Sequence, residues 1–312
     1  MNTPHGSTLS LLALLAVTSA CATGEVEPRD AAVDAAATRD APVVTDTPST
    51  ELDAPAPDDA AADDVATDAG PPVDSGRCVA NNDGVLERGE LAFVIGATVL
   101  YASNDDDVVV DPVDVNGATV EGQRVWNYAA ARDTDRRVLD EVLSPQGRWW
   151  SSFYPDATFA TVIERSTQTL GVYRVSATAL ELLATVSSDA GRTNLRFTPP
   201  VLVLRFPLRV GDTWEQSVNG AGTLNFTGFA NVSRYVNRVD TRGEVWTPAG
   251  RFPAMRLNTE LDQSVPLTIF RVTRRTYTFV SECLGVVARV ASVDNDTSAS
   301  FTRASEYRRL GL

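Results

Sequence analysis

The sequence predicts an all-β fold, a mostly antiparallel open half-barrel or sandwich with one or two short helices, preceded by a disordered acidic linker. Apolar and polar residues alternate over residues 180–186 and 255–261, as they do on half-buried strands. Residues 201–206 (VLVLRF) form a nearly continuous apolar run, which is typical of a central strand. Turn motifs such as Asn219-Gly220 recur between these runs. Many short strands joined by frequent turns favour a sandwich or a barrel.

Residues 1–20 are predicted to be a signal peptide. Residues 9–17 (LSLLALLAV) form an apolar run that is too short to cross a bilayer as a helix, and small residues follow it. The small residues directly before Cys21 resemble the lipobox of bacterial lipoproteins, in which the cysteine becomes the acylated first residue. Thr18 stands where that motif usually has leucine. Ordinary signal-peptide cleavage and secretion are therefore the alternative.

The lipobox resemblance implies that Cys21 carries a lipid anchor and that the membrane is a partner of the chain. Ala22 follows the cysteine, whereas lipoproteins retained at the inner membrane commonly have aspartate there. The resemblance thus implies an outer membrane lipoprotein, either periplasmic or surface-facing.

Residues 21–77 are predicted to form a disordered tether rich in alanine, aspartate and proline. Residues 22–77 contain 14 alanines, 14 acidic residues and 7 prolines but no aromatic residue, and their net charge is -11. Such a segment buries too little apolar surface to offset the entropy of ordering. It either lifts a domain away from a membrane or serves as a solubilising spacer.

Residues 78–312 are predicted to form one β domain, since this length can bury a substantial core. The domain has only three more acidic than basic residues, and no basic stripe indicates a nucleic-acid partner. Apolar residues at helical spacing predict a short helix within residues 134–143. A weaker pattern predicts a second helix within residues 156–165.

Three motifs in the second half of the domain carry a family resemblance. They are PLRVGDTW (residues 207–214), EVWTPAGRFPAMRL (residues 244–257) and YTFVSECLGVVARVAS (residues 277–292). In this order they resemble uncharacterised envelope lipoproteins of myxobacterial type. Such domains look similar to the Lol-like half-barrels of periplasmic lipoprotein carriers, whose concave apolar face holds acyl chains. The resemblance implies a fold able to hold a hydrophobic ligand, and it implies no known activity.

The basic residues of the chain restrict its chemistry. All 27 of them are arginine, and the only histidine is His5, inside the predicted signal peptide. The mature chain therefore lacks a histidine general base, a histidine-activated nucleophile, a histidine-ligated zinc and a lysine Schiff base. We expect the protein not to be an enzyme.

One enzymatic alternative is left by this composition. A carboxylate-dependent hydrolase needs two acids about 5 to 10 Å apart. The acid pairs that could serve are Glu164 with Glu181 and Glu215 with Glu244.

Cys78 and Cys283 are predicted to form a disulfide. If Cys21 is acylated, these two cysteines remain as an even pair in an oxidising compartment. Two separately buried thiols are the alternative. On the chain-entropy model the bond stabilises the fold by roughly 4 to 5 kcal/mol.

Four aromatic residues are the candidate ligand-binding side chains. Four aromatic rings crowd residues 149–154, and such rings can stack on a sugar or line an apolar groove. Packing in the core of a β domain is the alternative role. The candidates are Trp126, Trp149, Trp150 and Tyr154.

Asp105, Asp107 and Asp111 are weak candidates for metal ligands. Five carboxylates lie within residues 105–114, and oxygen ligands in a loop suit calcium. A solvated acidic turn is the alternative. No cofactor other than calcium is expected.

Together these features predict a non-catalytic envelope lipoprotein that binds a hydrophobic or lipid-like ligand in a β concavity. The alternative is a structural or adhesive surface protein that binds a protein or a glycan through exposed aromatic residues. The predicted partners are the membrane, through the lipid anchor, and the hydrophobic ligand.

Overall fold

A computed structural model describes residues 78, 80–91, 93–104, 107–266 and 268–311. The predicted signal peptide, Cys21 and the predicted tether lie outside the described residues. Among the residues that are described, no helix has both the length and the apolar character needed to cross a membrane.

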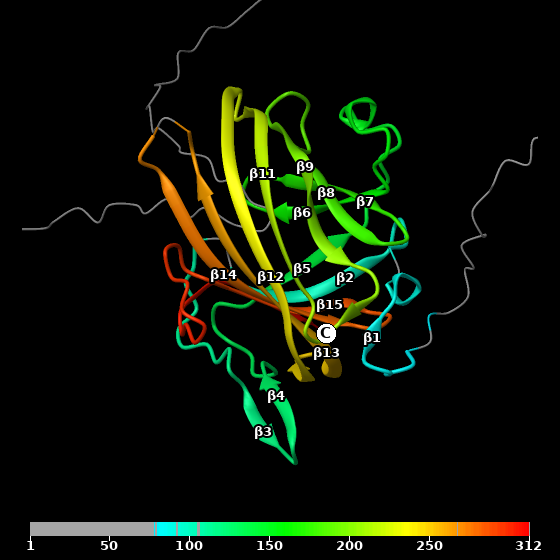
Figure 1. Cartoon of the computed structure of the whole chain (residues 1–312), viewed down its shortest axis with the longest axis vertical. Helices are drawn as coiled ribbons and strands as arrows, with labels where there is room; N and C mark the ends of the chain where they lie inside the picture. Colours follow the sequence, from blue (N-terminus) through cyan, green and yellow to red (C-terminus); the bar gives the residue numbers. More distant parts are fainter. Residues whose placement is uncertain (1–77, 79, 92, 105–106, 267, 312) are drawn as a thin grey trace, which may run out of the picture. The chain divides into compact units, whose positions relative to one another are not determined.

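The described part of the chain is all-β, as predicted (Figure 1). Only two short 3-10 helices are present within it, η1 (Arg88–Glu90) and η2 (Ser151–Phe153). The strands are β1 (Val85–Leu86), β2 (Thr98–Ser103), β3 (Ala118–Val120), β4 (Gln123–Asn127), β5 (Arg136–Glu141), β6 (Phe159–Glu164), β7 (Thr169–Val175), β8 (Ala179–Ser187), β9 (Asn194–Arg205), β10 (Leu208–Arg209), β11 (Thr213–Leu224), β12 (Thr227–Thr247), β13 (Gly250–Ser264), β14 (Arg271–Ser281), β15 (Gly285–Ser292) and β16 (Ala304–Leu310).

Both segments predicted to be helical are strands, so these two predictions were wrong. Residues 134–143 contain β5, in which the polar Asp140 lies largely buried while the apolar Leu139 is 64% exposed. Residues 156–165 contain β6, in which both faces are covered by apolar side chains. A strand of either kind does not show the alternation of a half-buried strand, and its apolar spacing can imitate that of a helix.

One long, curved antiparallel sheet contains most of the strands. Its order is β5-β2-β16-β15-β14-β13-β12-β11-β9-β8-β7-β6, and the β3–β4 hairpin adds a parallel pairing to the end of β12. The two edges approach each other where the chain just after β5 meets the start of β6: the Leu143 N–H bonds to the Ala160 carbonyl at 2.8 Å and the Ala160 N–H bonds to the Leu143 carbonyl at 3.0 Å. The sheet is therefore nearly closed upon itself.

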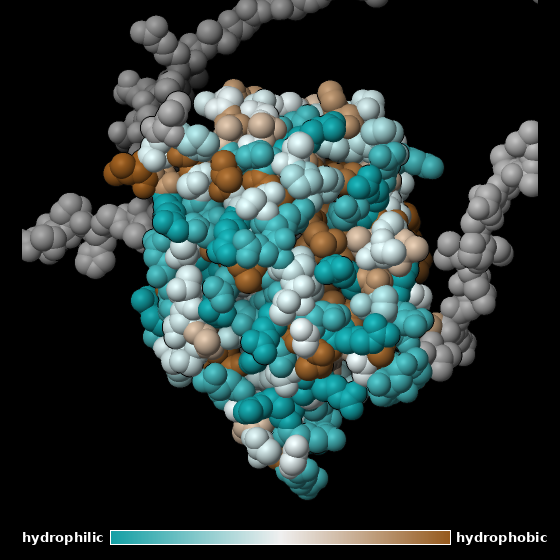
Figure 2. All heavy atoms as spheres, viewed as in Figure 1, coloured by the Kyte–Doolittle hydropathy of each residue, from teal (hydrophilic) through white to brown (hydrophobic). Residues whose placement is uncertain are grey.

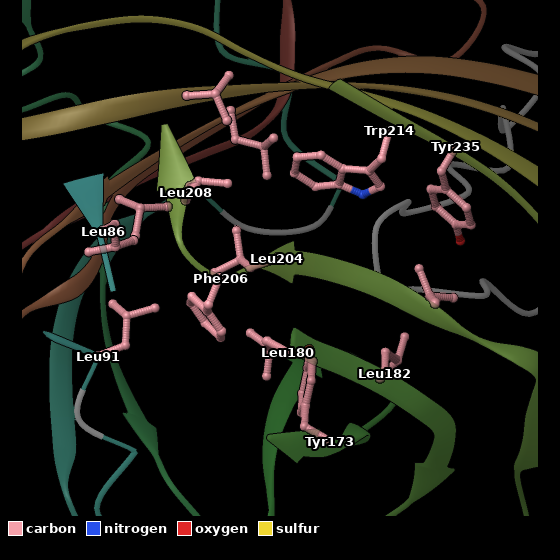
Figure 3. Packing of buried hydrophobic residues seen from close by; sticks show 14 of the residues in the cluster. Leu86, Leu91, Tyr173, Leu180, Leu182, Leu204, Phe206, Leu208, Trp214 and Tyr235 are labelled. Atoms are coloured by element: carbon pink, nitrogen blue, oxygen red, sulfur yellow. The ribbon is translucent and has the colours of Figure 1, made fainter. Parts of the chain in front are cut away.

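The main core fills the interior of the curved sheet. Side chains from β7, β8, β9, β11, β12 and β13 converge there, and β1 and β10 close one end (Figure 3). Two further clusters cover the outer face: one under residues 110–128 and 301, the other under residues 149–157. The interior residues shown and labelled are Leu86, Leu91, Tyr173, Leu180, Leu182, Leu204, Phe206, Leu208, Trp214 and Tyr235.

The predicted disulfide is confirmed, because Cys78 and Cys283 are bonded. Cys283 lies in the turn between β14 and β15, and its N–H donates to the Glu90 carbonyl at 2.7 Å. The bond thus fastens the first described residues, with the buried Leu86 and Leu91, to a turn that is 205 residues away in sequence. This segment closes one end of the interior.

The disulfide provides a test of the fold. Replacing both cysteines (Cys78→Ser with Cys283→Ser) is expected to lower the free energy of unfolding by roughly 4 to 5 kcal/mol, because the unfolded chain regains the entropy of a long loop. Equilibrium denaturant unfolding of the full chain, compared with the same chain carrying Cys21→Ser alone, measures this difference. A change below about 1 kcal/mol would mean that the bond does not hold the end of the sheet.

Candidate functional site

The candidate site is a partly open cavity of about 230 Å³ where the two edges of the curved sheet approach each other. Its lining comes from β2, β5, β13, β14, β15 and β16 and from β6, β7, β8 and β9. Most of the surface is apolar, with Leu180, Leu204, Leu257, Val280 and Val286 as typical members. Ligand sites of proteins share this character, an apolar concavity with a few polar groups.

Three aromatic rings form a continuous stack along one side of the cavity. Phe93 stacks on Phe159 with ring centroids 4.9 Å apart, and Phe159 stacks on Tyr173 at the same distance. Burial raises the pKa of Tyr173, so its hydroxyl stays neutral. The stack is an apolar surface against which a hydrophobic group can pack.

A chain of ion pairs lies at the polar side of the cavity. Arg289 contacts Glu306 at 2.7 Å, and Arg308 contacts Glu306 at 3.6 Å and Asp140 at 3.0 Å. Arg165 continues the chain, with its guanidinium 2.5 Å from Asp140. These contacts join β15, β16, β5 and the end of β6, so the network extends across the two edges of the sheet.

The network keeps a buried carboxylate charged. Burial alone would raise the pKa of Glu306, but Arg289 and Arg308 oppose it more strongly and hold the pKa below its ordinary value. Burial would also lower the pKa of the Arg308 guanidinium, but Glu306 and Asp140 raise it overall. The cavity therefore combines an apolar wall with fixed charges of both signs.

The four predicted aromatic candidates lie in the two outer clusters and do not line the cavity. Trp126 is fully buried, and its indole N–H donates to the Val115 carbonyl at 3.1 Å. Trp150 and Tyr154 are buried against the outer face of β6 to β8, with Trp149 packed beside them. Ligand contact by these residues stays a prediction, and each of them has a packing role in the structure.

The acidic loop lies on the surface. Asp107 and Asp111 are exposed, and Asp111 is 3.9 Å from Arg303, while Asp105 lies outside the described residues. Within the part of the chain that the structure covers, no three acidic, histidine or cysteine side chains form a group that could hold a metal ion. The calcium site stays a prediction.

The acid pairs of the hydrolase alternative each have local partners. Glu181 pairs with Arg174 at 2.9 Å, and Glu215 pairs with Arg234 at 2.7 Å. Glu164 accepts from Thr167, and Glu244 accepts from the Trp246 indole. None of these four acids lines the apolar cavity.

A second cavity, of about 520 Å³, lies beside the β3–β4 hairpin and is more polar than the first. Its charged lining residues are Arg124, Arg242, Glu244 and Glu282. Leu86, Met255 and Val280 also line it, but none of its lining residues is aromatic.

Comparison with known proteins gives little guidance to function. No family model and no curated protein matches the chain. Among solved structures, the hypothetical lipoprotein YmcC from Escherichia coli aligns over 70% of this chain and 89% of its own, with 8% identity and a TM-score of 0.35. A putative lipoprotein from Parabacteroides distasonis aligns over 70% and 95%, with 11% identity and a TM-score of 0.33. At these values the similarity assigns neither a family nor an activity.

Glu306 provides a test of the ion-pair network. Its folded pKa lies below that of the unfolded chain, so its stabilisation is complete above about pH 4.3 and is lost as the pH falls through the folded value. Glu306→Gln is expected to cost about 3 kcal/mol near neutral pH, because it removes the carboxylate that the buried Arg289 and Arg308 share. The variant should then lose less further stability than the native chain on acidification.

Denaturant unfolding between about pH 6 and pH 3 measures this difference. The control is Glu215→Gln, which breaks an exposed ion pair and should behave like the native chain. Equal loss of stability by native and Glu306→Gln proteins on acidification would show that Glu306 is not a stabilising carboxylate.

Proposed function

We propose that this protein is a non-catalytic envelope lipoprotein whose β domain holds a hydrophobic or lipid-like ligand in its interior cavity. The observation that carries this proposal is the apolar cavity lined by the stack of Phe93, Phe159 and Tyr173. An apolar cavity of about 150 Å³ already accepts benzene. The cavity here is larger and partly open, so it suits one acyl chain or an apolar ring, and part of a longer ligand can extend beyond the opening.

The proposed location rests on the sequence before the domain. A signal peptide ending at a cysteine, followed by a long acidic segment, supports a lipid anchor on Cys21 and a tether to the outer membrane. Secretion without an anchor is the alternative. On the face of the domain shown in Figure 2, hydrophobic residues occur in small separate groups. Surfaces that face water have this character.

The adhesive alternative receives less support from the site. It needs Trp149, Trp150 and Tyr154 exposed together on one surface. Trp150 and Tyr154 are buried and Trp149 is half-buried. Phe153 is the exposed ring of this segment.

Ligand binding can be tested with dansylundecanoate, a fluorescent fatty acid whose emission rises in an apolar site. Val203 is partly buried and lines the cavity. Val203→Trp is expected to fill the cavity and to weaken binding at least about tenfold, while Thr227→Trp, at an exposed position, should leave binding unchanged. A native protein that does not bind the probe would contradict the proposed function.

The anchor can be tested separately by intact mass spectrometry of the protein extracted from bacterial membranes. A diacylglycerol-type mass on a chain that starts at Cys21 is the expected result. Cys21→Ser should abolish the added mass and release the chain into the soluble fraction. Native protein without an acyl mass would mean that the chain is secreted or retained in another way.

A further inference from the structure

The two edges of the sheet face each other along a seam, which we define as residues 138–143 on the β5 side and residues 160–165 on the β6 side. Leu143 and Ala160 form one backbone-bonded pair at the end of this seam. Among the described residues, no further strand pairing joins β5 to β6. Even the shortest contact elsewhere along the sheet, between β16 and β2, has three paired residues on each strand.

The cavity reaches this seam. Its lining includes Asp140, Glu141 and Val142 from the β5 side and Thr161, Val162 and Ile163 from β6. Extending the Leu143–Ala160 register by two residues places Glu141 opposite Val162. Apart from the Leu143–Ala160 pair, the wall of the cavity is formed there by two strands whose backbones are not paired with each other.

An ion pair crosses the seam away from the Leu143–Ala160 pair. The Arg165 guanidinium, which is about one-third exposed, contacts Asp140 from the opposite edge at 2.5 Å. Asp140 also contacts Arg308 inside the cavity at 3.0 Å. The charged groups therefore extend from the water-facing side of the seam to the interior.

The two ends of the interior are better closed than the seam. One end is covered by the segment that contains Leu86 and Leu91, which the disulfide fastens to the β14–β15 turn. Toward the other end, the inward-facing residues of β12 and β13 include Asn231, Asn237 and Gln263, all at most 5% exposed. Separating the edges at the seam breaks the Leu143–Ala160 backbone pair and the Arg165–Asp140 ion pair, whereas the first end is held by a covalent bond.

We infer that the seam between β5 and β6 is the entrance to the cavity and that the ligand is a single-chain amphiphile whose polar end stays at the Arg165–Asp140–Arg308 cluster. This inference rests on the proposed function. The cavity volume of about 230 Å³ lies below the ~300 to 1,000 Å³ of typical drug-sized ligand sites, so it suits one chain and not the two chains of a bilayer lipid.

The polar end of the ligand is inferred from the free-energy cost of removing water from charged side chains. A purely apolar ligand at the seam would remove water from Asp140 and Arg308 without replacing its hydrogen bonds, which is unfavourable. A carboxylate, hydroxyl or phosphate at that point replaces those bonds, while the attached chain lies against the stack of Phe93, Phe159 and Tyr173.

An engineered disulfide across the seam tests whether the ligand enters the cavity there. In the full chain carrying Cys21→Ser, Glu141→Cys with Val162→Cys should form a disulfide between the two edges. The rate of dansylundecanoate uptake, followed by stopped-flow fluorescence, is expected to fall at least about tenfold in the oxidised form and to recover on reduction. Protein without the new cysteines, treated with the same reductant, controls for reduction of the Cys78–Cys283 bond.

The matched control is an engineered disulfide between two strands that are already paired by backbone hydrogen bonds. Arg234 and Asp262 are paired on β12 and β13, and both side chains face away from the cavity. Arg234→Cys with Asp262→Cys should leave the uptake rate within about twofold of the native rate. An unchanged uptake rate in the oxidised variant with the disulfide across the seam would overturn the inference and leave the proposed function intact. A native chain that does not bind the probe would contradict the proposed function itself.

The ion pair and the polar end can be tested with the same probe. Arg165→Gln should speed uptake about threefold or more, whereas Arg174→Gln, which breaks the Arg174–Glu181 pair between β7 and β8, should not. Octanoate or octanol should displace the probe at concentrations at least about tenfold lower than octane does. An unchanged rate in Arg165→Gln would overturn the entrance, and equal displacement by octane would overturn the polar end.

Discussion

The structure depends on how a single long sheet protects the backbone hydrogen-bonding groups of its two edge strands. An unpaired edge exposes backbone donors and acceptors, and proteins protect such edges by pairing, covering or charging them. Here the chain brings β5 and β6 together, joins them by the Leu143–Ala160 pair and crosses the remaining gap with the Arg165–Asp140 ion pair. The curvature that this closure requires is what creates an interior with two facing walls.

The interior consequently has an apolar part and a charged part. Apolar residues from the strands of both walls make the main core, and the aromatic stack leaves part of that space unfilled. Arg289, Glu306 and Arg308 place charges beside the same space, where the two arginines stabilise the charged form of Glu306. A cavity with one apolar wall and one charged side recognises molecules that have the same division.

The sequence allowed the fold class to be predicted because strand alternation and turn motifs are local signals. Cys78 and Cys283 could be paired by cysteine arithmetic, and the structure confirms the bond. The cavity residues could not be predicted, since Phe93, Phe159 and Tyr173 come together only through the closure of the sheet. The aromatic residues within residues 149–154 predicted a binding site in the sequence, but this segment packs on the outer face of the sheet. The charged side could not be predicted either, since Asp140 stands among other charged residues in β5 (RRVLDE) and its burial appears only in the folded structure.

Native mass spectrometry of the full-length protein extracted from bacterial membranes tests the central claim most directly. The account predicts one non-covalent amphiphile per chain, additional to any acyl anchor, which dissociates on denaturation and is identified in the released fraction as a single-chain molecule. A native mass equal to that of the covalently modified chain, unchanged after incubation with saturating dansylundecanoate, would contradict it.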